Sequence, residues 1–108
     1  MLPNLNNRAL PLIKAFRGAY DKYAKLTDFG KTTDEPVHFT LEGYMAVKLI
    51  AEAIRRTRDP SPEGVRRGLE QLRNFDLGGY FVDFSPTKHT GSKWVDLSII
   101  GAKGELLY

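Results

Sequence analysis

The segment from about residue 40 to residue 58 constrains this chain most, because its apolar residues surround much of a helix. These apolar residues are Leu41, Tyr44, Met45, Val47, Leu49, Ile50, Ala53 and Ile54. We expect the Thr40 hydroxyl to cap the free amides of the first turn, where Glu42 is also favourably placed. A helix that is apolar on more than one side is buried on more than one side. The rest of the fold must therefore offer this helix several packing partners.

Two further helices are predicted on either side of it. Apolar residues recur at helical spacing over about 8–26, and charged residues occupy the other side of that segment. Ser61 is a good helix cap and Pro62 suits a first helical position, so a third helix is predicted over 62–73. Between the first two helices, residues 27–36 lack periodicity and are predicted to form a loop.

The last third of the chain has the alternation of strands. From Gly78 the hydrophobic period changes from 3.6 residues to 2, and glycines at 78 and 79 suit a bend. The predicted strands cover residues 79–84, 94–100 and 105–108. A short extended piece is also expected at 37–39. The expected order of elements is three helices followed by a β hairpin or meander. Two or three short strands cannot cover the second helix. Its other packing partners are therefore expected to be absent from this chain or to come from another copy of it.

The composition excludes several classes of protein and site. The chain has 108 residues, of which 42% are hydrophobic and 27% charged, which fits one soluble domain rather than a disordered or coiled-coil chain. The absence of cysteine excludes disulfides and thiolate chemistry. His38 and His89 lie far apart without neighbouring ligands, so we expect neither a metal nor a cofactor. The first residues show no basic region before an apolar stretch, so no signal peptide is expected in this chain.

An arginine cluster offers one functional interpretation. The net charge is +3, and the densest basic group is Arg55, Arg56, Arg58, Arg66 and Arg67, interrupted by acidic residues. Arginines in a last helical turn interact favourably with the helix dipole, so a solvated face is the simpler interpretation. The alternative is a self-contained small α+β interaction domain with a basic face that binds polyanions.

A second interpretation places a ligand at the start of the second helix. Free amides at a helix start attract anionic groups, and an aromatic side chain beside them can cover an apolar ligand part. Phe39, Thr40 and Glu42 are the candidate ligand-binding residues. The structural alternative is that Thr40 caps its own helix and Phe39 belongs to the core. No catalytic motif occurs in the sequence, so an enzyme is not expected.

Several segments in this order resemble a known family. They are LEGYMAV at 41–47, GLEQL at 68–72, FDLGG at 75–79, DFSP at 83–86 and HTGS at 89–92. Their combination resembles the carboxy-terminal part of type I periplasmic binding proteins of the branched-chain amino-acid (Leu/Ile/Val) receptor class. The resemblance covers nearly the whole chain, and Phe16 and Tyr20 match the helix that commonly precedes the Glu-Gly-Tyr segment.

The resemblance implies a two-lobed α/β receptor that closes on a small solute, such as an amino acid or related organic acid, and delivers it to an ABC importer. It implies no covalent chemistry and no nucleic-acid partner, and it implies a periplasmic or extracellular location, with a lipid anchor in a Gram-positive cell. The family's loops for the ligand's α-amino and α-carboxylate groups have no counterpart in this sequence. We therefore expect the isolated chain not to bind ligand alone and to self-associate. Phe39 would be an aromatic wall of the ligand site, with Thr40 and Glu42 next and Tyr44 in packing.

Overall fold

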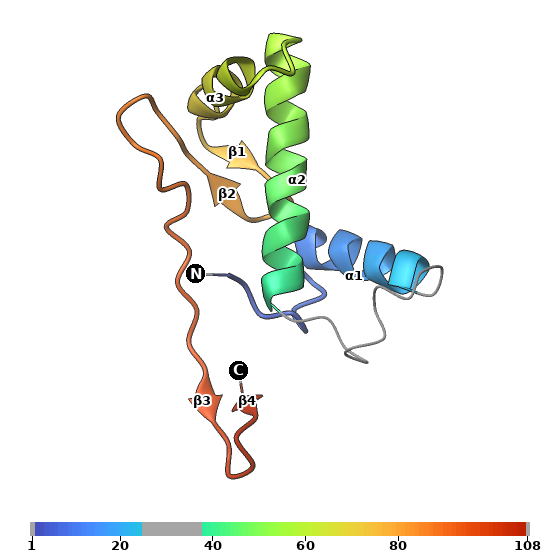
Figure 1. Cartoon of the computed structure of the whole chain (residues 1–108). Coiled ribbons are helices and arrows are strands. Elements are labelled where there is room, and N and C mark those ends of the chain that lie inside the picture. Colours follow the sequence, from blue (N-terminus) through green and yellow to red (C-terminus); the bar gives the residue numbers. More distant parts are fainter. Residues whose placement is uncertain (1, 25–37, 108) are drawn as a thin grey trace.

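The helices precede the strands in the computed structural model, which describes residues 2–24 and 38–107 (Figure 1). The elements are α1 (Pro11–Ala24), α2 (His38–Thr57), α3 (Pro62–Glu70), β1 (Phe75–Asp76), β2 (Phe81–Val82), β3 (Ile99–Ile100) and β4 (Leu106–Leu107). Three helices followed by strands confirm the predicted arrangement. None of these helices is long and apolar enough to cross a membrane.

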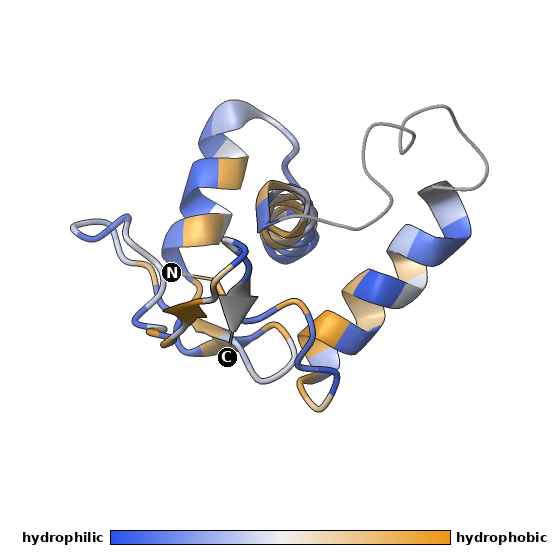
Figure 2. Ribbon diagram, turned by 90° about the horizontal axis from the view of Figure 1, so that it is seen from below, coloured by the Kyte–Doolittle hydropathy of each residue, from blue (hydrophilic) through white to orange (hydrophobic). Residues whose placement is uncertain are grey.

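The long helix α2 is the centre of the fold, with α1 packed near one of its ends and α3 near the other (Figures 1 and 2). The buried cluster joins α1, α2 and the β1–β2 hairpin through Leu12, Ile13, Phe16, Leu41, Met45, Leu77, Tyr80 and Val82. The Phe16 ring packs against the Tyr44 ring, with 5.4 Å between the centroids. One face of α2 is therefore buried as predicted.

Within the described residues, the opposite side of α2 is largely uncovered over its first three turns. Phe39, Val47 and Ile50 are exposed apolar residues. At about 100° per residue, these three side chains lie within roughly 80° of one another and point away from Leu41 and Met45. Over its first turns, the described residues therefore cover α2 on one side, whereas α3 packs against its second half at Ala53.

The start of α2 differs from the prediction. The helix already begins at His38, so His38 and Phe39 are helical rather than extended, and Thr40 lies inside the first turn instead of capping it. Its end at Thr57 is one residue earlier than predicted. The predicted loop at 27–36 and the predicted extended residue Val37 lie outside the described residues.

The other helices are shorter than predicted. α1 begins at Pro11 rather than at 8, because residues before it form turns and a proline suits a first helical position. Residues 25 and 26 lie outside the described part. α3 begins as predicted, with the Ser61 side chain accepting a hydrogen bond from the Gly64 amide. It ends at Glu70 rather than at 73, and Asn74 adopts a φ of 45° shortly afterwards, which a helix cannot contain.

The first hairpin turns at Gly78 and Gly79, which confirms the predicted bend. Their φ angles are 108° and 82°, and both amides donate to the Asp76 carboxylate at 2.7 Å. The Gly78 carbonyl accepts a hydrogen bond from the Leu12 amide at 2.9 Å, which ties the hairpin to the start of α1. The predicted strand at 79–84 is wrong in extent, since only Phe81–Val82 pairs, and its partner β1 was not predicted.

The carboxy-terminal segment extends away from the helices (Figure 1). Of the predicted strand at 94–100, only Ile99–Ile100 pairs, with β4, and within the described residues 94–98 have no strand beside them. Its apolar side chains at Val95, Leu97, Ile99 and Ile100 are exposed. The radius of gyration is 15.7 Å, against about 13 Å for a compact domain of this length. The described residues thus carry apolar surface that they do not cover.

Candidate ligand-binding site

The first turn of α2 presents the predicted site residues to solvent. Phe39 is 85% exposed, so it does not belong to the core. Thr40 and Glu42 are also exposed, and Thr40 does not cap the helix. The two structural alternatives, Phe39 in the core and Thr40 as the cap of its own helix, are therefore wrong. Phe39 is an exposed aromatic side chain beside a helix start.

The helix directs these three side chains to different sides. At about 100° per residue, Thr40 and Glu42 point roughly 160° apart, with Phe39 between them. The structure therefore does not bring the three together around one point. Tyr44 is half-buried against Phe16, which agrees with the packing role that was expected for it.

Glu42 lines a small pocket beside α2. Its volume is about 200 Å³. Its walls include Met45 and Leu49 of α2, together with Tyr80 and Phe84. A carboxylate at the edge of an apolar hollow can orient a ligand by its donors, while the walls hold the apolar part.

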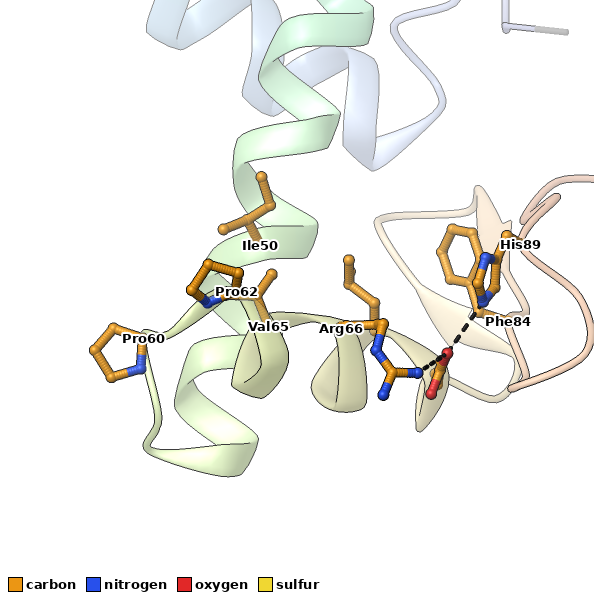
Figure 3. A pocket seen from close by; sticks show the side chains of 9 residues that line it. Ile50, Pro60, Pro62, Val65, Arg66, Phe84 and His89 are labelled. Atoms are coloured by element: carbon orange, nitrogen blue, oxygen red, sulfur yellow. Dashed lines mark hydrogen bonds and ion pairs between the residues drawn. The ribbon is translucent and has the colours of Figure 1, made fainter.

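A larger pocket lies between α2, α3 and the turn that follows β2. Its volume is about 650 Å³, and its apolar walls are Ile50, Pro60, Pro62, Val65, Leu69 and Phe84. Figure 3 shows Val65 and Ile50 on one side of it and Phe84 and His89 on the other, with Arg66 between them. Cavities of this size and composition accommodate small organic molecules.

A chain of ionic contacts forms the polar edge of this larger pocket. Arg66 donates to Glu63 and to Glu70, and His89 Nε2 lies 3.1 Å from the same Glu70 oxygen. The hydrogen bond from Arg66 lowers the pKa of Glu63, and the same bond raises the pKa of Arg66. The Glu70 side chain is only 10% exposed, so the hydrogen bonds from these partners offset the burial of its carboxylate.

The arginine cluster is largely engaged in ion pairs of its own. Arg55 and Arg56 both bind Glu52, at 2.6 and 2.9 Å, and Arg67 binds Asp59 at 2.9 Å. Hydrogen bonds from Arg55, and next from Arg56, lower the pKa of Glu52. An arginine paired with a carboxylate attracts a phosphate less strongly. This arrangement favours the solvated face over the polyanion interpretation.

The larger pocket was not predicted from the sequence. In the sequence, Glu70 is one of the acidic residues that interrupt the basic cluster, and His89 is a histidine without neighbouring metal ligands. The spacing of Arg66 and Glu70 does indicate a helical ion pair, but the approach of His89 from a distant turn has no sequence signal. Within 2–24 and 38–107, no group of three or more His, Asp or Glu side chains is arranged to hold a metal ion.

Comparisons with known proteins relate nearly the whole chain to ligand-binding receptors. A family described as periplasmic binding protein matches residues 1–103. The structure is similar to an extracellular ligand-binding receptor from Verminephrobacter eiseniae ef01-2, with a TM-score of 0.79 and 26% identity over 99% of this chain. It is also similar to a substrate-binding periplasmic protein from Ralstonia solanacearum, with a TM-score of 0.73 and 33% identity over 98% of this chain. The chain spans 29% of the length of each of these two proteins. No curated protein matches it in sequence.

Proposed function

Because the chain belongs to the periplasmic binding protein family, we propose that it forms part of a two-lobed receptor that binds a small solute for an ABC importer. The receptor works in the periplasm or outside the cell, and residues 1–108 form a carboxy-terminal portion of it. Binding occurs by closure of the lobes without covalent chemistry, and the solute is an amino acid, with branched-chain amino acids first, or a related organic acid.

The uncovered apolar surface is the observation that carries this proposal. The exposed face of α2 and the exposed side chains of 95–100 lie on separate parts of the chain. Soluble proteins rarely leave such surface open unless something covers it. The related structures are more than three times as long as this chain, so the remaining polypeptide of such a receptor can supply the cover.

Within this receptor, the first turn of α2 contributes to the ligand site. The exposed Phe39 ring forms an aromatic wall, and Glu42 and Thr40 supply polar contacts on either side of it. The different directions of these side chains support a cleft in which other segments complete the site. The isolated chain therefore lacks most of the ligand's partners.

A chimeric receptor tests this function. In it, residues 1–108 replace the aligned segment of the Ralstonia solanacearum protein, and leucine, valine and phenylalanine are titrated calorimetrically. We expect the chimera to bind one of them and the isolated chain to bind none. Phe39→Ala in the chimera should weaken binding about tenfold, because an aromatic ring loses its buried contact with the ligand.

The matched control is Phe81→Ala, which removes another exposed phenylalanine, in β2 rather than α2, and should change affinity less than about twofold. Micromolar binding of any of the three amino acids to the isolated chain would contradict the proposal. If the chimera binds none of the three, the proposal of an amino-acid substrate is contradicted. Equal effects of the two substitutions on affinity would remove Phe39 from the site.

A further inference from the structure

The larger pocket is lined by the Glu70 carboxylate, one oxygen of which has no hydrogen-bond partner among the described residues, and we propose that this pocket binds a small organic ammonium ion with an apolar body. The pocket lies away from the first turn of α2, although Phe84 also lines the small pocket beside Glu42. Ile50 is the residue of α2 that lines this pocket. It lies eleven residues after Phe39, which is about 16 Å along a helix. This inference therefore stands independently of the proposed receptor function.

Glu70 provides the anchoring charge. Its Oε1 atom accepts hydrogen bonds from Arg66 Nη1 at 2.9 Å and from His89 Nε2 at 3.1 Å. Its Oε2 atom accepts none from the described residues, although the side chain is nine-tenths buried. A charged oxygen in such a place gains most from a charged donor, because ionic hydrogen bonds are stronger than neutral ones.

The charges around the pocket select a cation over an anion. All three guanidinium nitrogens of Arg66 already donate to carboxylates: Nε and Nη2 to Glu63, and Nη1 to Glu70. An incoming carboxylate thus finds no unused nitrogen on Arg66 and meets Glu70 instead. Glu63 does not line the pocket, and of the charged pair that does, Arg66 and Glu70, Glu70 keeps an oxygen without a partner among the described residues, which favours an ammonium group.

The walls define the rest of the ligand. Ile50, Val65, Leu69 and Phe84 line the cavity of about 650 Å³ with apolar groups. Figure 3 shows Phe84 beside His89, with Ile50 and Val65 on the other side of Arg66. An aryl or branched alkyl group buries its surface there while the ammonium reaches Oε2. Ligands with a second charge next to the amine do not fit, because that charge would be buried without a partner.

The probe for this site is 2-phenylethylamine, titrated into the 108-residue chain and followed by NMR and calorimetry. We expect a dissociation constant of about 1 mM or tighter. Two matched probes should bind at least about tenfold more weakly. 2-Phenylethanol keeps the ring and loses the charge, while phenylalanine adds a carboxylate beside the ammonium. On the unaltered chain, equal affinity for the three probes would overturn the proposal, and so would the absence of 2-phenylethylamine binding.

A pair of variants then locates the site. Glu70→Gln keeps an oxygen acceptor for Arg66 but removes the charge, and it should weaken amine binding at least about tenfold. Glu63→Gln removes the other carboxylate that binds Arg66 without touching the pocket wall, so amine affinity should change far less. Equal losses in the two variants would assign binding to the general charge of α3 and overturn the assignment to Glu70. Because this test uses the isolated chain and a simple amine, its failure leaves the chimera experiment unaffected.

Discussion

Replacing Gly68 with alanine is expected to force α3 away from α2 and to lower the free energy of unfolding by about 1–3 kcal/mol. Gly68 is buried where the two helices touch. A Cβ atom added there would lie 2.5 Å from the Ala53 carbonyl oxygen and 2.7 Å from the Ala53 Cα atom. Both neighbours belong to the backbone of α2, so they can move only if the helix moves. Urea unfolding followed by circular dichroism measures the change.

Gly43→Ala is the matched control for this substitution. Gly43 also lies inside a helix, but a Cβ atom added there would meet nothing within 4 Å. The same exchange should therefore stabilise the chain by about 0.5–1 kcal/mol through helix propensity alone. Equal stability of the two variants would show that α2 and α3 do not pack as closely as the structure has them.

Replacing Gly78 with alanine is expected to lower the free energy of unfolding by about 2–4 kcal/mol, since strain and crowding act together. Its φ of 108° disfavours any side chain, and an added Cβ atom would lie 2.6 Å from the Leu12 amide nitrogen. That amide donates to the Gly78 carbonyl, so relief of the clash also breaks the hydrogen bond that joins the hairpin to α1. Thermal unfolding and the near-ultraviolet signal of Tyr80 report the loss.

Gly104→Ala separates strain from crowding. Gly104 has a φ of 81°, but an added Cβ atom would meet nothing within 4 Å. We expect a cost of about 1–2 kcal/mol that is confined to the β3–β4 hairpin. If the Gly78→Ala variant and the unaltered chain have the same midpoint of urea unfolding, the contact between the hairpin and α1 is contradicted.

The parts of the fold that depend on local chemistry could be predicted from the sequence. Ser61 followed by Pro62 marks the start of α3, because a hydroxyl acceptor and a residue without an amide suit the first turn. Gly78 and Gly79 mark the hairpin, because their positive φ angles strongly favour glycine. The apolar positions of α1 and α2 likewise predict Phe16, Leu41 and Met45 as core residues.

Features that depend on distant partners could not be predicted in the same way. The alternation over 94–100 indicates which side chains share a face, but pairing also needs a neighbouring strand, and only Ile99–Ile100 has one among the described residues. Thr40 has the chemistry of a cap, yet the helix extends two residues before it. The larger pocket depends on the approach of His89 to Glu70 across nineteen residues, which no periodicity encodes.

The family could also be predicted from the sequence, through the order of short segments rather than through any one of them. No single segment between 41 and 92 is distinctive, but their spacing agrees with the match over residues 1–103. The site residues are a different matter. Phe39 is exposed at a helix start as a ligand wall would be, while Thr40 and Glu42 point to opposite sides, so a complete site needs segments from elsewhere in a receptor.

Amide hydrogen exchange of residues 95–98 tests most directly whether this chain is part of a larger receptor. In the isolated chain these amides have no strand partner among the described residues, so they should exchange quickly. In the chimera with the Ralstonia solanacearum protein, we expect the remaining polypeptide to cover them and to slow exchange about a hundredfold or more. Equal exchange rates in the isolated chain and in a folded chimera would contradict a receptor that covers this segment.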